Sequence, residues 1–524
     1  LADNVPIDVV RKMGADIVIA VDVGTPLEPR ENLTSLVSIT AQLSGLLVVR
    51  NAKVQIATLT DRDVLITPQL GSDITSSSFD MVDKAIPIGY EGANEKRAQL
   101  ERLAISAARY HEDRIFIESC VSAPAPVQFV KIDNQSRFAD SVIQERLHIP
   151  LGEPLDTKEL DKDIGQIYAL GFLNLVTYTL TEENGQSGVI VHVTQDSRGT
   201  RFLEWGLDLF SDGSSTDANL RLAVLNTGLD KYGSEQRVMV QLGETPAAIW
   251  EIYKAVDPTR QLYLRPKVFW EKQTLDTFND SGNILNTYSV NQWGGQIDIL
   301  KELSHYAAIS AGVRRFSGDA DVEIGPPSTP GYSYNGAEYV FNAALDRLDD
   351  RYIPNHGTLG NITYLKSSTA LGADDPYEQI MTQLYGVWTT HRHTIFGGFR
   401  YDITLDNDAP IYALFRAGGL FNLSGLEPNR VVGQNFGELL ASYRYDLNEK
   451  GGLFPAFIGV SAEFGNAGEQ KKDPFSNGIM NGSLYFANRS PIGPLYWGVG
   501  FAEGGERVYF LKVGNVFGRT TIGR

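Results

Sequence analysis

Strict alternation of apolar and polar residues, with a period of two, runs from about residue 198 onward and limits the fold of the chain more than any other feature. In Phe202–Phe210, three leucines share one face with Trp205, while acidic residues and glycine share the other. Leu439–Leu447 and Leu495–Phe501 repeat the pattern. Because successive side chains of a strand point to opposite faces, each segment is predicted to be a strand with one apolar face.

The length of this region predicts how many strands it holds. At about 20 residues per strand and connection, its roughly 325 residues give about sixteen strands, an even number typical of membrane barrels. Such a sheet must close, because lipid offers no partner to an unpaired edge. The last strand, with Tyr509 and Phe517 on one face, resembles the terminal strand of outer-membrane barrels. We predict a 16-stranded antiparallel transmembrane β-barrel over residues 198–524; the alternative is a soluble β-rich domain that needs no detergent.

Charge and residue usage exclude several classes of function. The net charge of −18 argues against nucleic acid as a partner, which needs a basic surface. The single cysteine, Cys120, cannot form an intrachain disulfide and is expected to be inert. No apolar run reaches about 18 residues, so no transmembrane helix is predicted. His391 and His393 would share one face of a strand, but no third ligand is evident, and we expect no metal site.

Residues 1–121 have a different hydrophobic pattern, in which segments with helical periodicity alternate with short apolar runs typical of buried strands. Pro6 suits the first turn of a helix, and Gly14 can end it. This region is predicted to be part of an α/β domain. Its further predicted elements are a strand over 17–21, a helix over 33–49, a strand over 52–59 and a helix over 94–113.

Residues 122–197 are predicted to form a compact β-α-α-β-β domain. Asp156 is the expected N-cap of the second helix, with Glu159 completing an acidic capping box. The buried stripe of that helix is predicted to be Leu160, Ile164, Ile167 and Tyr168. The other predicted elements are a strand over 127–132, a helix over 137–147, and strands over 175–180 and 188–193 joined by a turn at 183–185.

The stretches ADNVPIDVVRKMGADIVIAVDVG, DVLITPQLGS and FDMVDKAIPIGYEGA resemble the C-terminal part of patatin-like phospholipases. The resemblance implies hydrolysis of lipid acyl esters by a Ser–Asp dyad, with no cofactor and no metal. No G-x-S-x-G motif occurs in the chain, and both dyad residues are expected upstream of Leu1. Asp3, Asn4 and Pro6 are predicted to be structural residues next to the dyad, Asp3 capping the helix that follows.

The stretches FVKIDNQSRFADSVIQERL and IYALGFLNLVTYTL resemble a POTRA domain. Domains of that family bind extended polypeptide by adding a strand to the edge of their sheet. A single copy is also compatible with a rigid spacer between two larger domains, and this alternative stays open.

The stretch RAGGLFNLSGLEPNRVVGQNFGELLASYRYDL resembles the barrels of two-partner secretion and of outer-membrane assembly factors. In that family one loop folds back into the lumen, and its Arg-Gly-aromatic tip docks on an acid of the barrel wall. The resemblance places Glu463 as the wall acid and Ser424 where the family has Arg, so only a neutral hydrogen bond is expected instead of a charge-assisted lock. The residues of the tip are Leu423, Ser424, Gly425 and Leu426.

A patatin-like part, one POTRA domain and a barrel, in this order, resemble the type Vd autotransporters over essentially the whole chain. The resemblance implies a bacterial outer-membrane protein with its POTRA domain in the periplasm and its patatin-like domain at the cell surface or released. The expected partners are the outer-membrane bilayer, membrane phospholipids, the outer-membrane assembly machinery and, in a homodimer, a second copy of the chain. The alternative is a pure secretion or assembly pore whose α/β domain is not catalytic.

Overall fold

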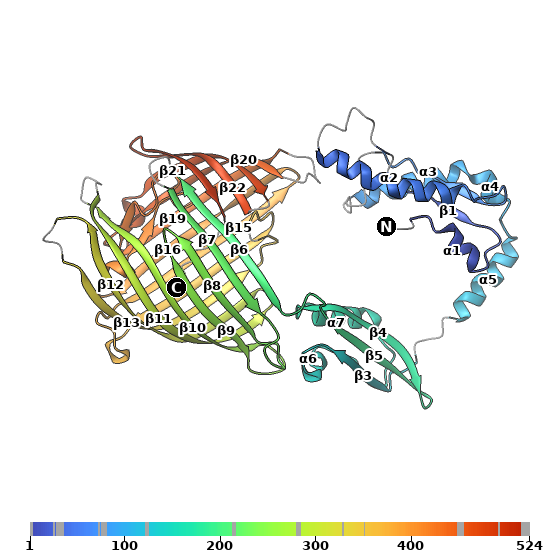
Figure 1. The fold of residues 1–524 in the computed structure, drawn as a ribbon, viewed down its shortest axis with the longest axis horizontal. Helices are drawn as coiled ribbons and strands as arrows, with labels where there is room; N and C mark the ends of the chain where they lie inside the picture. Colours follow the sequence, from blue (N-terminus) through green and yellow to red (C-terminus); the bar gives the residue numbers. More distant parts are fainter. Residues whose placement is uncertain are drawn as a thin grey trace. The chain divides into compact units, whose positions relative to one another are not determined.

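The computed structural model describes residues 4–24, 27, 36–71, 74, 81–120, 125–211, 216–278, 284–326, 330–350, 352–447, 455–490 and 493–514. The chain divides into two compact units, Leu1–Ala123 and Pro124–Arg524. The first is α/β, and the second holds a small α+β domain and a large barrel (Figure 1).

The first unit is built around a short pair of parallel strands. Its elements are α1 (Ile7–Lys12), β1 (Ile19–Val21), α2 (Leu36–Ile56), β2 (Val64–Ile66), α3 (Val82–Glu95), α4 (Arg97–Glu101) and α5 (Ala107–Cys120). β1 pairs with β2 through Ala20 and Leu65. Asp63 fixes the start of β2, because its buried carboxylate accepts hydrogen bonds from the Val18 amide (2.8 Å) and the Thr60 amide (2.8 Å). None of the described helices combines the length and the apolar character needed to cross a bilayer.

Two predictions for this unit are wrong. The strand expected over 52–59 is instead the last part of α2, because Ala52 and Ile56, four residues apart, both pack on the small core. The helix expected over 94–113 is broken between α4 and α5, where the hydroxyl of Ser106 accepts a hydrogen bond from the Arg109 amide (3.2 Å) and so starts a new helix.

The small domain has the predicted β-α-α-β-β order. It consists of β3 (Phe129–Gln135), α6 (Asp140–Gln144), α7 (Thr157–Tyr168), β4 (Leu173–Glu183) and β5 (Gln186–Gln195), with β5 between β3 and β4 in the sheet. The central strand buries Val189, Val191 and Val193 completely against the helices. Asp156 caps α7 as predicted and accepts from the Lys158 amide (2.9 Å). Tyr168 is exposed, contrary to the prediction, because the buried stripe of α7 ends at Ile167.

Sixteen antiparallel strands close into a barrel, which confirms the predicted strand number (Figure 1). β23 completes the closure by pairing with β6. The strands are β6 (Arg201–Ser211), β7 (Thr216–Asn226), β8 (Glu235–Gly243), β9 (Ala247–Ala255), β10 (Leu262–Phe278), β11 (Ile284–Ser304), β12 (Ala307–Ile324), β13 (Tyr332–Asp346), β14 (Gly357–Ser367), β15 (Glu378–Thr390), β16 (His393–Asp406), β19 (Asn435–Asp446), β20 (Ala456–Gly468), β21 (Ile479–Ser490), β22 (Gly493–Ala502) and β23 (Arg507–Val513).

The two faces of the barrel wall differ as the alternation predicts. Trp205, Leu439 and Trp497 are exposed on the outside, whereas Glu438 and Tyr496, their neighbours in sequence, are buried inside. The exposed apolar residues of the strands therefore point away from the lumen, whereas other apolar and aromatic residues line the interior. An apolar outer surface over a polar and aromatic interior is the arrangement that a barrel in lipid requires, and the opposite of a soluble barrel.

The small domain packs against the near end of the barrel, which we define as the end at which β6 begins. The Ala139 amide donates to the Lys231 carbonyl (2.8 Å) in the turn between β7 and β8. The Arg146 guanidinium donates to the Thr259 carbonyl (3.1 Å) in the turn between β9 and β10. In the first turn, burial would raise the pKa of Asp230, but hydrogen bonds from Ser234 and nearby groups outweigh it and lower this pKa to about 2. Two near-end turns thus hold the domain.

The loop-filled barrel lumen as the candidate functional site

A long loop from the far end of the barrel, residues 407–434 between β16 and β19, folds back into the lumen. We call it the far-end loop. It contains a 3-10 turn, η4 (Ile411–Ala413), and a short hairpin of β17 (Phe415–Ala417) and β18 (Val431–Gly433). At its base, the amide side chain of Gln434 donates to the Ala409 carbonyl (3.0 Å) and accepts from the Ala409 amide (2.9 Å). This reciprocal pair of hydrogen bonds holds the two ends of the loop together.

The tip of the far-end loop is anchored on one buried carboxylate of β20. The Ser424 amide donates to Glu463 Oε2 (2.6 Å), and the Ser424 hydroxyl donates to Oε1 (2.5 Å). A third donor, the hydroxyl of Ser461, reaches Oε1 at 2.6 Å. Both Ser424 and Glu463 are buried. Neutral donors thus take the place of the guanidinium that the family resemblance leads one to expect, and a backbone amide supplies one of them.

A second acid and a close backbone contact fix the register of the tip. The Leu423 amide donates to Glu438 Oε1 (3.0 Å), on the strand next to that of Glu463. Gly425 lies directly against β22: a Cβ at this position would come within 2.2 Å of the Phe501 carbonyl carbon. A Cβ at Gly500 would likewise come within 1.8 Å of the Ser424 carbonyl oxygen. Only glycine fits at either position.

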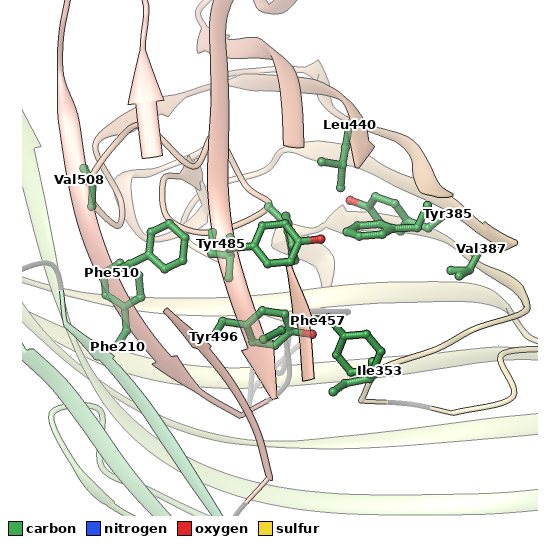
Figure 2. Packing of buried hydrophobic residues seen from close by; sticks show 14 residues of the cluster. Phe210, Ile353, Tyr385, Val387, Leu440, Phe457, Tyr485, Tyr496, Val508 and Phe510 are labelled. Atoms are coloured by element: carbon green, nitrogen blue, oxygen red, sulfur yellow. The ribbon is translucent and has the colours of Figure 1, made fainter. Parts of the chain in front are cut away.

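Phe421 joins the tip to an aromatic cluster on the inner wall. Its ring makes edge-to-face contacts with Phe396 (5.0 Å between centroids), Tyr485 (5.2 Å) and Tyr496 (6.0 Å). Figure 2 shows the cluster around Tyr485 and Tyr496, to which Phe457 of β20 also belongs. Edge-to-face pairs of this kind add to the burial of the rings themselves. The loop is therefore held by apolar packing as well as by the two acids.

The wall formed by β10–β13 is lined differently, with buried ion pairs. Arg314 pairs with Glu338, whose other oxygen accepts from the Tyr377 hydroxyl (2.6 Å). Nearby, Arg265 pairs with Asp298 (2.8 Å). Charged groups on the inside and apolar groups on the outside of the same strands are typical of a lumen that admits water.

The structure brings together the predicted residues of the loop tip and the wall acid, and it spreads the other predicted residues over the molecule. Tyr509 is exposed on the outer face of β23. Asn4 is exposed, and Pro6 precedes α1 without a side-chain cap hydrogen bond. Asp3 and Phe517 lie outside the described residues.

Sequence reasoning missed Glu438, Phe421 and Gly500. Phe421 carried a usable signal, as an aromatic residue two positions before the predicted tip, and Glu438 carried a weaker one, as an acid on the polar face of a predicted strand. Gly500 carried none, because small residues are frequent on inward faces throughout this region.

The histidines give no support for a metal centre in the barrel. His391 lies in the turn between β15 and β16 with a φ of 55°, so it does not share a strand face with His393 as predicted. In the small domain, ligand atoms of His148, Glu159 and Asp163 lie within 4.8 Å of one another. Both oxygens of Asp163 already accept hydrogen bonds from His148, from its amide (2.6 Å) and its ring (2.9 Å). These bonds account for the cluster as an anchor of the segment before α7.

Comparisons with known proteins agree with this architecture. Residues 125–196 match the POTRA family, described as surface antigen variable number repeat. BamA from Haemophilus ducreyi lacking POTRA domains 1–3 is similar in structure, with a TM-score of 0.58 and 15% identity over 73% of this chain and 84% of that one. CdiB from Acinetobacter baumannii (75% and 74% covered) and CdiB from Escherichia coli (74% and 76%) each give a TM-score of 0.49 at 11% identity. The comparison with curated proteins gives no match. The chain thus has a POTRA domain followed by a barrel of the outer-membrane type.

Proposed function

We propose that this chain is an outer-membrane transporter that takes extended polypeptide from the periplasm and delivers it through or along its barrel. The observation that carries the proposal is the far-end loop, which enters the lumen of a barrel attached to a POTRA domain and is anchored there by Ser424 on Glu463. A barrel that served only as an anchor would need neither a long inserted loop nor a POTRA domain at its mouth.

The arrangement of the domains supports a direction of transport. The POTRA domain packs on the near-end turns, and we place this end in the periplasm and the far end at the cell surface. In the sheet of the domain, β3 and β4 are edge strands, which offer backbone hydrogen-bonding groups to an added strand. Polypeptide captured at an edge would then lie next to the near-end mouth of the barrel.

The proposal is tested by ion current through the Gly425→Val variant of the full chain in planar lipid bilayers, in which the tip of the far-end loop cannot seat. Reduced and carboxymethylated ribonuclease serves as an unfolded polypeptide, added to one side at a time. We expect it to interrupt the current from the near end and to have little effect from the far end. Folded ribonuclease is the matched control and is expected to have no effect from either side. Equal effects from the two sides, or none, would contradict the proposal.

A second candidate function is that the first unit belongs to a patatin-like domain carried by this barrel. It is supported by the parallel pairing of β1 and β2 across a helix, and by Ile19 and Val21, which stay exposed. Parallel strands normally lie inside larger sheets covered on both faces. Helices packed on the open face of such a sheet would cover these residues.

The coding sequence upstream of Leu1 distinguishes the two candidates. A Gly-rich loop, a G-x-S-x-G motif and an Asp-Gly-Gly or Asp-Gly-Ala motif just before Leu1 would support the patatin reading, and an unrelated domain would oppose it. Purified residues 1–524 are expected to hydrolyse lipid esters no faster than the barrel alone. Turnover above that control would show that the chain holds a dyad of its own.

A further inference from the structure

A second loop enters the barrel, from the near end. It joins β13 to β14, and its described residues are 347–350 and 352–356; we call it the near-end loop. Ile353 is only 2% exposed and lies in the lumen cluster beside Phe457 and Tyr496 (Figure 2). A connection between adjacent strands normally lies on the surface, so burial of its apolar residue inside the barrel is a specific feature.

The near-end loop is held by strands well away from its own. The Arg489 guanidinium on β21 pairs with Asp350 (2.6 Å), although β15, β16, β19 and β20 separate β21 from β14 in the barrel. Arg444 on β19, itself buried, donates to the Pro354 carbonyl and to the Asn355 side chain (2.9 Å). These contacts stretch the loop from one side of the near-end mouth toward the other.

The two inserted loops meet at one residue. Tyr496 packs edge-to-face against Phe421 of the far-end loop (6.0 Å), and its hydroxyl donates to the Tyr352 carbonyl of the near-end loop (3.5 Å). Ile353 belongs to the same apolar cluster as Phe421. The cluster is therefore completed by one loop from each end of the lumen.

We propose that the near-end loop is a second plug, which closes the lumen in series with the far-end loop, so that the pore opens fully only when both loops leave. The proposal rests on the proposed function only in treating the lumen as a route. The ion pair of Asp350 and Arg489 lies at the partly exposed rim of this plug, where a polypeptide arriving from the near end could displace it.

The test measures steady ion current through the full chain in planar bilayers, without any polypeptide. Gly425→Val releases the far-end loop, because any Cβ there meets the backbone of β22. In that background, adding Asp350→Arg should raise the current about tenfold. Adding Arg489→Asp as well re-forms the ion pair with its charges exchanged and should return the current to its low value. In the wild-type background, Asp350→Arg alone should change little, because the far-end loop still closes the lumen.

A matched control reverses another charge in the lumen near the same end. Glu204 pairs with Arg237 at 3.0 Å without touching the near-end loop. Glu204→Arg in the Gly425→Val background should leave the current unchanged. The proposal is overturned if Asp350→Arg has no effect in that background, or if Glu204→Arg has an equal one. Because no polypeptide is present, neither result depends on whether the chain transports polypeptide.

A second measurement covers the case in which a variant does not insert correctly. Ile353→Cys, in a Cys120→Ser background, should resist maleimide, whereas Tyr352→Cys should react, because Tyr352 is 53% exposed. Adding Asp350→Arg should make Ile353→Cys react about as fast as Tyr352→Cys. Protection that persists despite Asp350→Arg would contradict the plug, provided that the barrel shows the heat-modifiable gel mobility of a folded one.

Discussion

The two loops inside the barrel are held in opposite ways. The far-end loop presents backbone amides, those of Leu423 and Ser424, to short, buried carboxylates on neighbouring strands. The near-end loop presents mainly carbonyl and carboxylate oxygens to two long arginine side chains. The tip of the far-end loop also lies with its backbone directly on that of β22, whereas the near-end loop is held through long arginine side chains with many rotamers. The comparison indicates a rigid closure at the far end and a compliant one at the near end.

The largest effect is expected at the rigid anchor. Gly425→Val should prevent the tip from seating, because its Cβ would overlap the backbone at Phe501. Limited trypsin digestion followed by mass spectrometry should then find cleavage at Arg430, which is largely buried in the seated loop. Gly206→Val is the matched control, since a Cβ at Gly206 meets open space. Equal protection of Arg430 in both variants would contradict the rigid anchor.

The next prediction compares the loss of stability caused by removing the Glu463 carboxylate with that caused by removing the Ser424 hydroxyl. Glu463→Ala leaves several buried donors without an acceptor and should lower the free energy of unfolding by about 3 kcal/mol. Ser424→Ala removes one hydroxyl but keeps the backbone donor, and should cost about 1 kcal/mol. Thermal loss of heat-modifiable mobility measures both. If Ser424→Ala cost as much as Glu463→Ala, the hydroxyl and not the backbone amide would be the main anchor.

A smaller effect is expected at the compliant end. Arg444→Met removes the donors to Pro354 and Asn355 but keeps a side chain of similar length, and should cost about 1 kcal/mol. It should also speed maleimide labelling of Ile353→Cys. Arg237→Met, which affects only the pair with Glu204, should leave labelling unchanged. A loss of stability as large as that of Glu463→Ala would mean that both ends are rigid.

The smallest effect is a dependence on pH at the near-end loop. Burial would raise the pKa of Asp349 and Asp350, but hydrogen bonds from amides of the same loop outweigh it and hold each pKa below 3.8. Groups with a lowered pKa stabilise the folded state above 3.8 and lose this contribution as the pH falls through the lower, folded value. Labelling of Ile353→Cys by a reagent that is insensitive to pH should therefore stay slow down to about pH 5 and accelerate below pH 4. An Asp349→Asn variant should show a weaker acceleration, and an identical profile would contradict this assignment.

The sequence predicts the parts of this molecule that depend on periodicity. Alternation predicts the barrel, its strand number and its apolar outer face, because each strand satisfies a local rule. The capping signal at Asp156 is local too, and it is confirmed. Predictions failed where tertiary contacts decide, as at 52–59, where packing of Ile56 extends a helix through residues that suit a strand.

The candidate site was predictable in part for the same reason. Ser424 and Glu463 could be paired through a resemblance, but not by spacing, since they lie 39 residues apart. The near-end loop has no comparable motif. Ile353 follows acidic and basic residues typical of an exposed turn, and it is held inside by arginines of distant strands and by the apolar cluster of the lumen. A closed sheet brings such distant residues together, and no local sequence pattern indicates these contacts.

The close approach of Gly425 and Gly500 has a mechanical consequence. The backbone of the tip rests on the backbone of β22 with no side chain between them, and the neighbouring amides of Leu423 and Ser424 are bound to the two acids. Under force, lifting the tip off the strand has to break its hydrogen bonds to both acids together. Its detachment should therefore appear as one abrupt step in a single-molecule record, with no partly seated level between the two states.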